Sequence, residues 1–86
     1  RPIDARYTCT VSSDCAIINR GNCCGYYPVC ANAKAQFTPK DACPGPGYVS
    51  VCGFPEISAC ECRQGGCYAL QGKQTVGVPP TEGAPV

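Results

Sequence analysis

Histidine, tryptophan and methionine are absent from this chain of 86 residues, and phenylalanine occurs only twice. The missing histidine removes the usual general base that activates a serine or cysteine nucleophile. The missing large side chains leave little apolar bulk for an interior, since the 44% hydrophobic content includes ten cysteines. Chains this small, with so little to bury, are commonly held together by crosslinks.

Clusters of charge and long apolar runs are also missing. Seven Lys and Arg residues stand against six Asp and Glu residues, scattered along the chain, for a net charge of +1. A surface that follows nucleic acid phosphates needs a basic cluster, so we expect no nucleic acid partner. No stretch approaches the ~18 apolar residues of a spanning helix, so we expect no membrane insertion.

Cysteine is what the chain has in abundance. An even number of cysteines in a chain this short predicts five disulfides, formed in an oxidising compartment. We therefore expect a secreted protein, in a mature form whose targeting segment has been removed. No cysteine is left over for a covalent dimer, so we expect a monomer. The ten positions are Cys9, Cys15, Cys23, Cys24, Cys30, Cys43, Cys52, Cys60, Cys62 and Cys67.

Metal binding and catalysis find little support in these residues. Structural zinc sites favour closely spaced cysteine pairs, often with histidine, and no Cys-x2-Cys pair is present. Acidic side chains could pair in principle, but a body this small has no room for a cleft that desolvates them. We expect no enzyme, no cofactor and no metal. The acidic residues considered are Asp14, Asp41, Glu56 and Glu61.

The distribution of cysteine divides the chain into three parts. Residues 1–8 form a lead-in without a crosslink, residues 9–67 form a stapled domain, and residues 68–86 form a tail rich in Gly and Pro. Segments of this composition are commonly extended and mobile, which is what we expect of the tail. The alternative is that Thr75–Val78 packs along the domain as an extra strand.

The stapled domain is expected to be a small disulfide-rich fold, mostly irregular, with short antiparallel β-strands and little helix. Gly and Pro recur too often for long periodic runs. The link Gln64–Gly66 between two short strands predicts a hairpin, and Pro44–Gly47 predicts a rigid double turn. The Ala-rich segment Ala31–Gln36 is the best helical candidate. The strand candidates are Asp14–Ile18, Tyr48–Gly53, Ala59–Arg63 and Gly66–Leu70.

A short internal echo accompanies these elements. Cys24-Gly25-Tyr26-Tyr27-Pro28 is similar to Cys52-Gly53-Phe54-Pro55, since each places a glycine, an aromatic residue and a proline after a cysteine. We interpret the two strings as turns in which glycine permits an unusual dihedral angle and an aromatic ring covers a bridge.

The first six cysteines follow the order Cys-x5-Cys-x7-Cys-Cys-x5-Cys-x12-Cys. This order resembles the inhibitor cystine knot, or knottin, framework, in which the first cysteine pairs with the fourth, the second with the fifth and the third with the sixth. The resemblance covers residues 9–43 and implies a knot-like core. The bridges that it implies are Cys9–Cys24, Cys15–Cys30 and Cys23–Cys43.

The last four cysteines are then expected to pair among themselves. Adjacent Cys23 and Cys24 cannot easily bridge each other, because of the separation that a disulfide requires, so they tie the chain to different partners. Ten cysteines allow roughly 945 pairings, and the sequence alone does not choose among them. For the last four, Cys52–Cys60 and Cys52–Cys62 both remain open, as does the partner of Cys67.

The same stretch weakly resembles the middle of a WAP-type four-disulfide module, in which an acidic residue precedes the second cysteine as Asp14 precedes Cys15. The two upstream cysteines of that module are missing here, and its inhibitory segment lies between them. The resemblance therefore does not bring an inhibitory role with it. The strings 21–28 and 50–57 are also similar to small secreted cysteine-rich proteins of fungi and other eukaryotes.

Inhibition of a serine protease is the most specific functional hypothesis that such a scaffold suggests. A disulfide body can hold an exposed loop extended, so that a protease binds it with little loss of entropy. Ala16–Asn22, Ala31–Ala42 and Gly53–Ala59 are the loops between cysteines that could serve. We expect the contact at Arg20 or in the last of these loops. The candidate contact residues in the loops are Ile18, Arg20, Lys34, Phe54 and Ile57.

The alternative is a secreted effector or toxin-like protein that binds a non-protease receptor or a polysaccharide. Tyrosine supplies contact area at low entropic cost, and the five tyrosines could form an exposed aromatic face. Tyr26 and Tyr27 are neighbours, so in an extended segment one of them points outward. The competing interpretation is that the tyrosines form the core of a body so poor in Trp and Phe.

Overall fold

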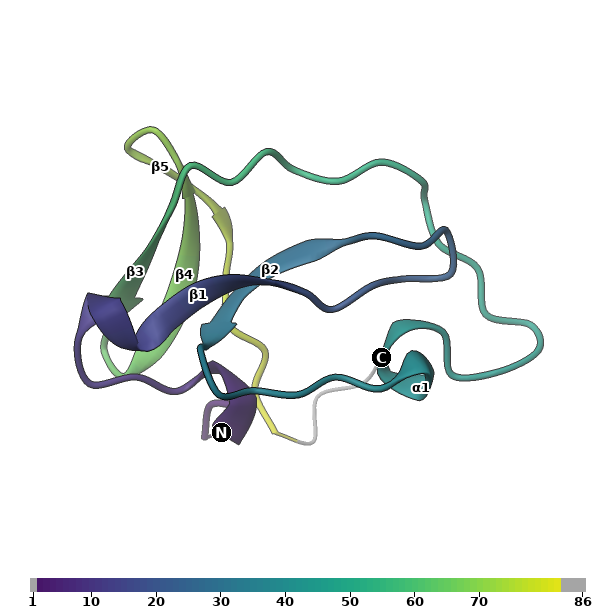
Figure 1. The fold of residues 1–86 in the computed structure, drawn as a ribbon, viewed down its shortest axis with the longest axis horizontal. Helices are drawn as coiled ribbons and strands as arrows, with labels where there is room; N and C mark the ends of the chain where they lie inside the picture. The colour runs from purple at the N-terminus through teal and green to yellow at the C-terminus, as the bar shows by residue number, and fades with distance from the viewer. Residues whose placement is uncertain (1, 83–86) are drawn as a thin grey trace.

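Two small antiparallel sheets and a long irregular connection make up the chain in a computed structural model that describes residues 2–82 (Figure 1). The predicted fold class, disulfide-rich with short strands and little helix, is confirmed. No helix within the described range has the length and apolar character needed to cross a membrane. The elements are η1 (Ala5–Tyr7), η2 (Ser12–Asp14), β1 (Cys15–Asn19), β2 (Pro28–Asn32), α1 (Pro39–Ala42), β3 (Ala59–Arg63), β4 (Gly66–Gln71) and β5 (Gln74–Gly77).

The first sheet is the hairpin of β1 and β2, in which Ile17 lies opposite Cys30 and Ile18 opposite Val29. The β-branched side chains favour the extended backbone. Strand β2 is covered on both faces, since Cys30 and Ala31, which point to opposite sides, are both buried. It contacts β4 of the second sheet and η1 of the lead-in.

The second sheet has the strand order β3-β4-β5. Strand β3 has the predicted bounds, and the predicted hairpin between β3 and β4 is confirmed. Its two-residue turn places Gln64 at φ 50° and Gly65 at φ 82°. Positive φ at both central positions is the type I′ geometry that suits a tight hairpin. Strand β5 continues the sheet along β4.

Sulfur supplies much of the interior. Three bridges, Cys9–Cys62, Cys15–Cys67 and Cys30–Cys60, join the first hairpin and the segment before it to β3 and β4. Cys30, Cys67 and Ala69 form the buried cluster, with Ile57 and Val76 packed against it. The crosslinks thus lie where a larger protein would place bulky apolar side chains.

Two further bridges fix the other end of the molecule. Cys23–Cys43 and Cys24–Cys52 tie the tip of the first hairpin to the long connection between α1 and β3. This connection has no regular secondary structure over residues 43–58, and it runs alongside the first hairpin for much of the length of the molecule (Figure 1). The Cys23–Cys43 bridge is the one member of the implied knottin set that is present.

The implied bridge Cys9–Cys24 is wrong. Cys9 lies beside the β3–β4 turn, where its N–H donates to the carbonyl of Gly65 at 3.0 Å, and it pairs with Cys62. Cys24 lies at the far end of the first hairpin, in the turn that joins β1 to β2. The length of the hairpin separates the two residues.

The implied bridge Cys15–Cys30 is also wrong. The register of β1 and β2 places the two cysteines on one face of the hairpin, as diagonal neighbours. The second sheet lies against this face, and each sulfur bonds across to it rather than along the hairpin. Cys15 pairs with Cys67, and Cys30 pairs with Cys60.

The expectation that the last four cysteines pair among themselves fails for the same reason. Each of Cys52, Cys60, Cys62 and Cys67 bonds to a cysteine of the first hairpin or of the segment before it. Even Cys62 and Cys67, which lie opposite each other in the β3–β4 ladder, have separate partners. The two halves of the chain face each other, so every one of these bridges runs between them.

The segment after Cys67 is part of the body rather than a mobile tail as far as residue 82. Strand β5 corresponds to the alternative of an added strand. Beyond it, the N–H of Asp4 donates to the carbonyl of Pro80, and Thr81 pairs with Ile3. The two terminal segments therefore hold each other, and the lead-in supplies the buried Tyr7. Residues 1 and 83–86 of the predicted lead-in and tail lie outside the described part.

Two secondary-structure expectations are wrong. The segment Ala31–Gln36 begins inside β2, passes through a turn at residues 33–34 and ends without regular structure, because pairing with β1 overrides its alanine-rich composition. The four-residue helix α1 follows it, capped by Thr38 and started by Pro39. The candidate strand Tyr48–Gly53 has no ladder partner and is held instead by side chains and bridges.

Candidate functional site

The segment 43–52, here called the clamped loop, is covalently held at both ends by adjacent residues. Cys43 bonds to Cys23, and Cys52 bonds to Cys24. Because Cys23 and Cys24 are neighbours, their bridges draw the two ends of the loop to one place at the tip of the first hairpin. The two disulfides therefore fix the ends of the loop, regardless of the contacts that the residues between them make.

In the middle of the clamped loop, residues 48–52, only Ser50 is half-buried and the other residues are exposed. Val49 and Val51 are each 91% exposed. Between them, Ser50 accepts a hydrogen bond on its Oγ from the N–H of Cys23 at 3.0 Å. The carbonyl oxygen of Tyr48 lies 3.5 Å from the Cys23 sulfur. The loop thus presents two aliphatic side chains to solvent, one on each side of Ser50, whose side chain is hydrogen-bonded to Cys23.

The two cysteines to which the loop is bonded lie in a tight turn, residues 22–25. The N–H of Asn22 donates to the carbonyl of Gly25 at 2.9 Å, and the N–H of Gly25 donates back at 3.0 Å. The Asn22 side chain also accepts from the N–H of Cys24 at 2.8 Å. Gly25 has φ 120°, which an L side chain rarely adopts. These bonds fix the positions of the two anchoring cysteines.

The segment that leads to Cys43 is held in place by contacts of the helix α1. The Asp41 carboxylate accepts from the N–H of Thr38 at 2.7 Å, and it pairs with Arg6 at 3.1 Å. These hydrogen bonds, first that of the Thr38 N–H and then that of Arg6, hold the pKa of Asp41 below its usual value. Arg6 also lies over the Phe37 ring, 4.7 Å from its centroid.

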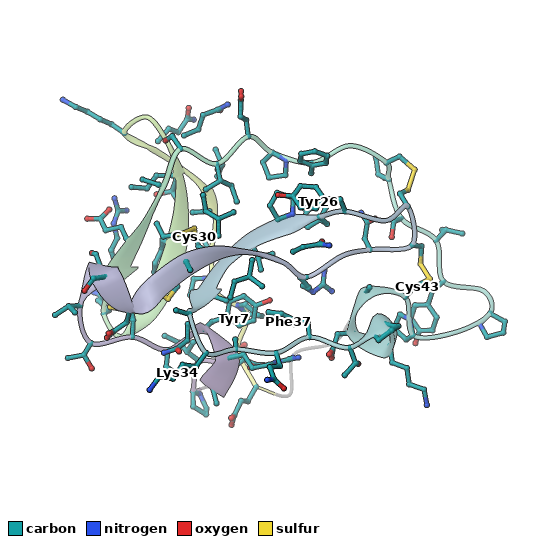
Figure 2. The ribbon with its side chains drawn as sticks, in the orientation of Figure 1. Tyr7, Tyr26, Cys30, Lys34, Phe37 and Cys43 are labelled. Atoms are coloured by element: carbon teal, nitrogen blue, oxygen red, sulfur yellow. A yellow bond between two sulfur atoms is a disulfide. The ribbon has the colours of Figure 1, made fainter. Side chains whose placement is uncertain are left out.

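Tyr26 and Phe54 form an exposed aromatic pair beside the Cys24–Cys52 bridge. Their rings meet edge to face, with centroids 4.9 Å apart. Figure 2 shows Tyr26 on the side of the first hairpin that faces the long connection, which is where Phe54 lies in the chain. The structure brings these two predicted contact residues together.

Three other predicted contact residues line a largely apolar cavity of about 260 Å³: Arg20, Tyr27 and Ile57. Burial raises the pKa of Tyr7, which also lines it. The Arg20 guanidinium is turned toward the protein, where its Nη2 donates to the carbonyl of Asp41 at 3.3 Å. The volume is below the ~300–1,000 Å³ of typical small-molecule sites, so the clamped loop is the better candidate.

The remaining predicted contact residues lie apart from both the aromatic pair and the apolar cavity. Ile18 is half-buried in β1, and Lys34 is exposed on a shallow depression near Arg6 (Figure 2). The tyrosines do not share one face: Tyr7 is buried, and Tyr68 lies on β4 beneath the Arg63 guanidinium.

Sequence reasoning missed the clamped loop, because it assigned Tyr48–Gly53 to a strand. The signal lay in the adjacent cysteines, whose two partners lie on either side of Val49 and Val51, but it became readable only once the pairing was known. A cluster of three sulfurs, from Cys9, Cys15 and Cys67, lies within 4.8 Å. Each of these sulfurs belongs to a disulfide, so none is a thiolate that could bind a metal.

No family model matches the chain, and no curated protein and no solved structure matches it.

Proposed function

We propose that this protein is a secreted inhibitor of serine proteases and that the clamped loop, residues 43–52, is the segment that enters the active site. The observation that carries the proposal is the double tether of that loop to Cys23 and Cys24, with Val49 and Val51 fully presented between the tethers. The disulfides are of the kind found in extracellular proteins.

The tethers explain why the loop would bind tightly. A flexible peptide loses conformational freedom when a protease holds it extended, and each immobilised side chain costs about 0.5–1.5 kcal/mol. In the clamped loop the disulfides and the Ser50 hydrogen bond restrict the backbone before binding. More of the contact energy then remains as affinity.

This proposal moves the contact away from the positions that the sequence favoured. The Arg20 guanidinium is engaged with backbone carbonyls of Gly21 and Asp41, and reaching an acidic pocket would break both hydrogen bonds. Phe54, in the loop 53–59, packs on Tyr26. Val49 and Val51 have no comparable ties through their side chains, and they are the most exposed large hydrophobic residues in the described part of the chain.

The test is inhibition of a panel of trypsin-, chymotrypsin-, elastase- and subtilisin-like proteases by the oxidised protein. We expect tight one-to-one inhibition of at least one of them, and its loss when Val49 and Val51 are both replaced by Asp. Val11→Asp is the matched control, since Val11 is an exposed valine outside the loop. Digestion or indifference across the panel would refute the proposal.

The second candidate, a binding protein for a non-protease receptor, is favoured by the exposed pair of Tyr26 and Phe54. Aromatic side chains at the centre of an interface commonly carry much of its binding energy. This candidate gains support if the protease panel shows no inhibition. Replacing both aromatic residues with Ala would then abolish binding to the receptor, whereas Val49→Asp would leave it intact.

A further inference from the structure

We propose that Val49 is the residue whose side chain fills the primary specificity pocket, and that the target is therefore an elastase-like protease with a small apolar pocket. This inference rests on the proposed function and names its target class. It also identifies the peptide bond between Val49 and Ser50 as the one placed at the catalytic serine.

The contacts on either side of Val49 select it over Val51. Both of its neighbours contact Cys23: Tyr48 through its carbonyl oxygen, 3.5 Å from the sulfur, and Ser50 through its Oγ, 3.0 Å from the amide nitrogen. Val49 thus lies between the hydrogen-bonded Ser50 and a carbonyl group that contacts the Cys23–Cys43 bridge, and its own side chain stays in solvent. The bond after Val49 leads to Ser50, which carries no disulfide, so this bond can enter an active-site cleft without a bridge on the next residue.

The bond after Val51 is less accessible. The next residue is Cys52, whose side chain is bonded to Cys24. Gly53 then turns the chain with φ 102° toward Phe54, which packs on Tyr26. A protease that placed this bond at its serine would meet the bridge and the aromatic pair directly on the leaving-group side.

The chemistry of valine indicates the kind of pocket. Its side chain is short, branched and uncharged, so an acidic pocket of the trypsin type would leave its own carboxylate without a partner. A deep pocket of the chymotrypsin type would keep an unfilled volume around valine and lose the corresponding contacts. A shallow apolar pocket is filled by valine and gains the burial of its methyl groups.

The two bridges also determine what happens if the bond is attacked. The protease serine oxygen bonds to the Val49 carbonyl carbon, and its proton passes through the protease histidine to the Ser50 nitrogen as the peptide bond breaks. The freed amine remains near the acyl group, because Cys43 and Cys52 are bonded to adjacent residues. Its return attack restores the peptide bond and gives the proton back to the serine.

Hydrolysis is the competing route. It consumes one water and leaves a carboxylate on Val49 and an ammonium group on Ser50. The cut chain stays in one piece, since the Cys23–Cys43 and Cys24–Cys52 bridges hold the two sides. We therefore expect long incubation to give an unreduced mass increased by one water and a new N-terminus at Ser50.

The experiment is an exchange of specificity measured with three enzymes of the elastase, chymotrypsin and trypsin classes. Val49→Lys is expected to weaken inhibition of the elastase-like enzyme by about 30-fold or more, as for a central contact residue, and to create inhibition of the trypsin-like enzyme. Val51→Lys is the matched variant, and we expect it to change the inhibition constant for the elastase-like enzyme by less than about fivefold.

The outcomes separate this inference from the function on which it rests. If the unaltered protein inhibits no protease, the proposed function fails and the assignment of Val49 fails with it. If the unaltered protein inhibits an elastase-like enzyme but Val51→Lys, rather than Val49→Lys, transfers inhibition to the trypsin-like enzyme, only the assignment of Val49 is overturned. Inhibition confined to trypsin-like enzymes would overturn the target class.

Discussion

Tyr26 and Phe54 meet edge to face at an interplanar angle of 81°, and each follows by two residues a cysteine of the disulfide that joins Cys24 to Cys52. Each aromatic residue follows a glycine of positive φ, 120° at Gly25 and 102° at Gly53. The two similar strings in the sequence are therefore bonded together through their cysteines and packed together through their rings. This local arrangement supports the last residue of the clamped loop.

The aromatic pair is expected to stabilise the tip of the molecule modestly. A double-mutant cycle of Tyr26→Ala and Phe54→Ala should give a coupling free energy of about 0.5–1.5 kcal/mol, because edge-to-face pairs gain that much beyond burial. The measurement is the free energy of unfolding with the disulfides intact. A coupling near zero would mean that the rings merely cover the bridge independently.

Removal of the Cys24–Cys52 bridge is expected to abolish inhibition while leaving the fold. Replacing both cysteines by Ser should lower the free energy of unfolding by about 3.6 kcal/mol in the chain-entropy model, given the sequence separation of 28 residues. The freed loop should then be cleaved as an ordinary substrate. Inhibition and cleavage rate are measured at a temperature at which circular dichroism shows folded protein.

The control for this experiment is a bridge outside the loop. Replacing Cys9 and Cys62 by Ser removes a bridge of larger sequence separation, 53 residues, but keeps both tethers of the clamped loop. We expect inhibition to survive in this variant at temperatures where it is folded. Equal loss of inhibition in the two variants would show that the tether has no role of its own.

The docking of the two terminal segments depends on a glycine. A Cβ at Gly66 would lie 2.8 Å from Cγ of Pro79 and 2.9 Å from Cδ1 of Ile3, so Gly66→Ala must push one or both segments away. We expect a loss of about 1–3 kcal/mol and faster exchange of the Asp4 amide, which donates to Pro80. The thermal midpoint and amide exchange measure these effects.

Gly45→Ala is the matched variant for that substitution. A Cβ there meets no atom within 4 Å, and Gly45 is not among the glycines of positive φ. We expect its thermal midpoint to equal that of the unaltered protein or to rise slightly. If Gly66→Ala behaves in the same way, the close packing of Pro79 and Ile3 on Gly66 is wrong.

Stability is expected to fall at acid pH. Hydrogen bonds hold the pKa of several carboxyls below the usual value: Arg6 acts on Asp4, the Thr10 and Val11 amides act on Asp14, and Thr38 acts on Asp41. A carboxyl with a lowered folded-state pKa contributes stability that is present above its unfolded pKa of about 3.9. That contribution is lost as the pH falls through the lower folded value.

The measurement is the denaturant midpoint between pH 7 and pH 2 with the disulfides intact. We expect little change down to about pH 5 and a decline below about pH 4. The variant Asp41→Asn should show a smaller acid-dependent decline than the unaltered protein, whereas Glu56→Gln, at an exposed position, serves as the control of equal charge change. An acid dependence that is the same in both variants would contradict the role given to Asp41.

The sequence by itself determined how the chain is held together. Ten cysteines with little apolar bulk predicted five disulfides, and Gln64–Gly66 predicted the β3–β4 hairpin, because turn chemistry is local. The positive φ values of Gly25 and Gly53 also followed from the similar strings around them. Each of these features depends on residues that are close in the chain or on composition.

Only the tertiary structure decided which cysteines meet. Spacing is a local property, whereas a bridge depends on which faces of the two sheets come together, so the order of the cysteines did not reveal that Cys15 bonds to Cys67. The candidate site also depends on the tertiary structure. Val49 and Val51 are unremarkable in the sequence, and they stand out because Cys23 and Cys24 gather both ends of the surrounding loop.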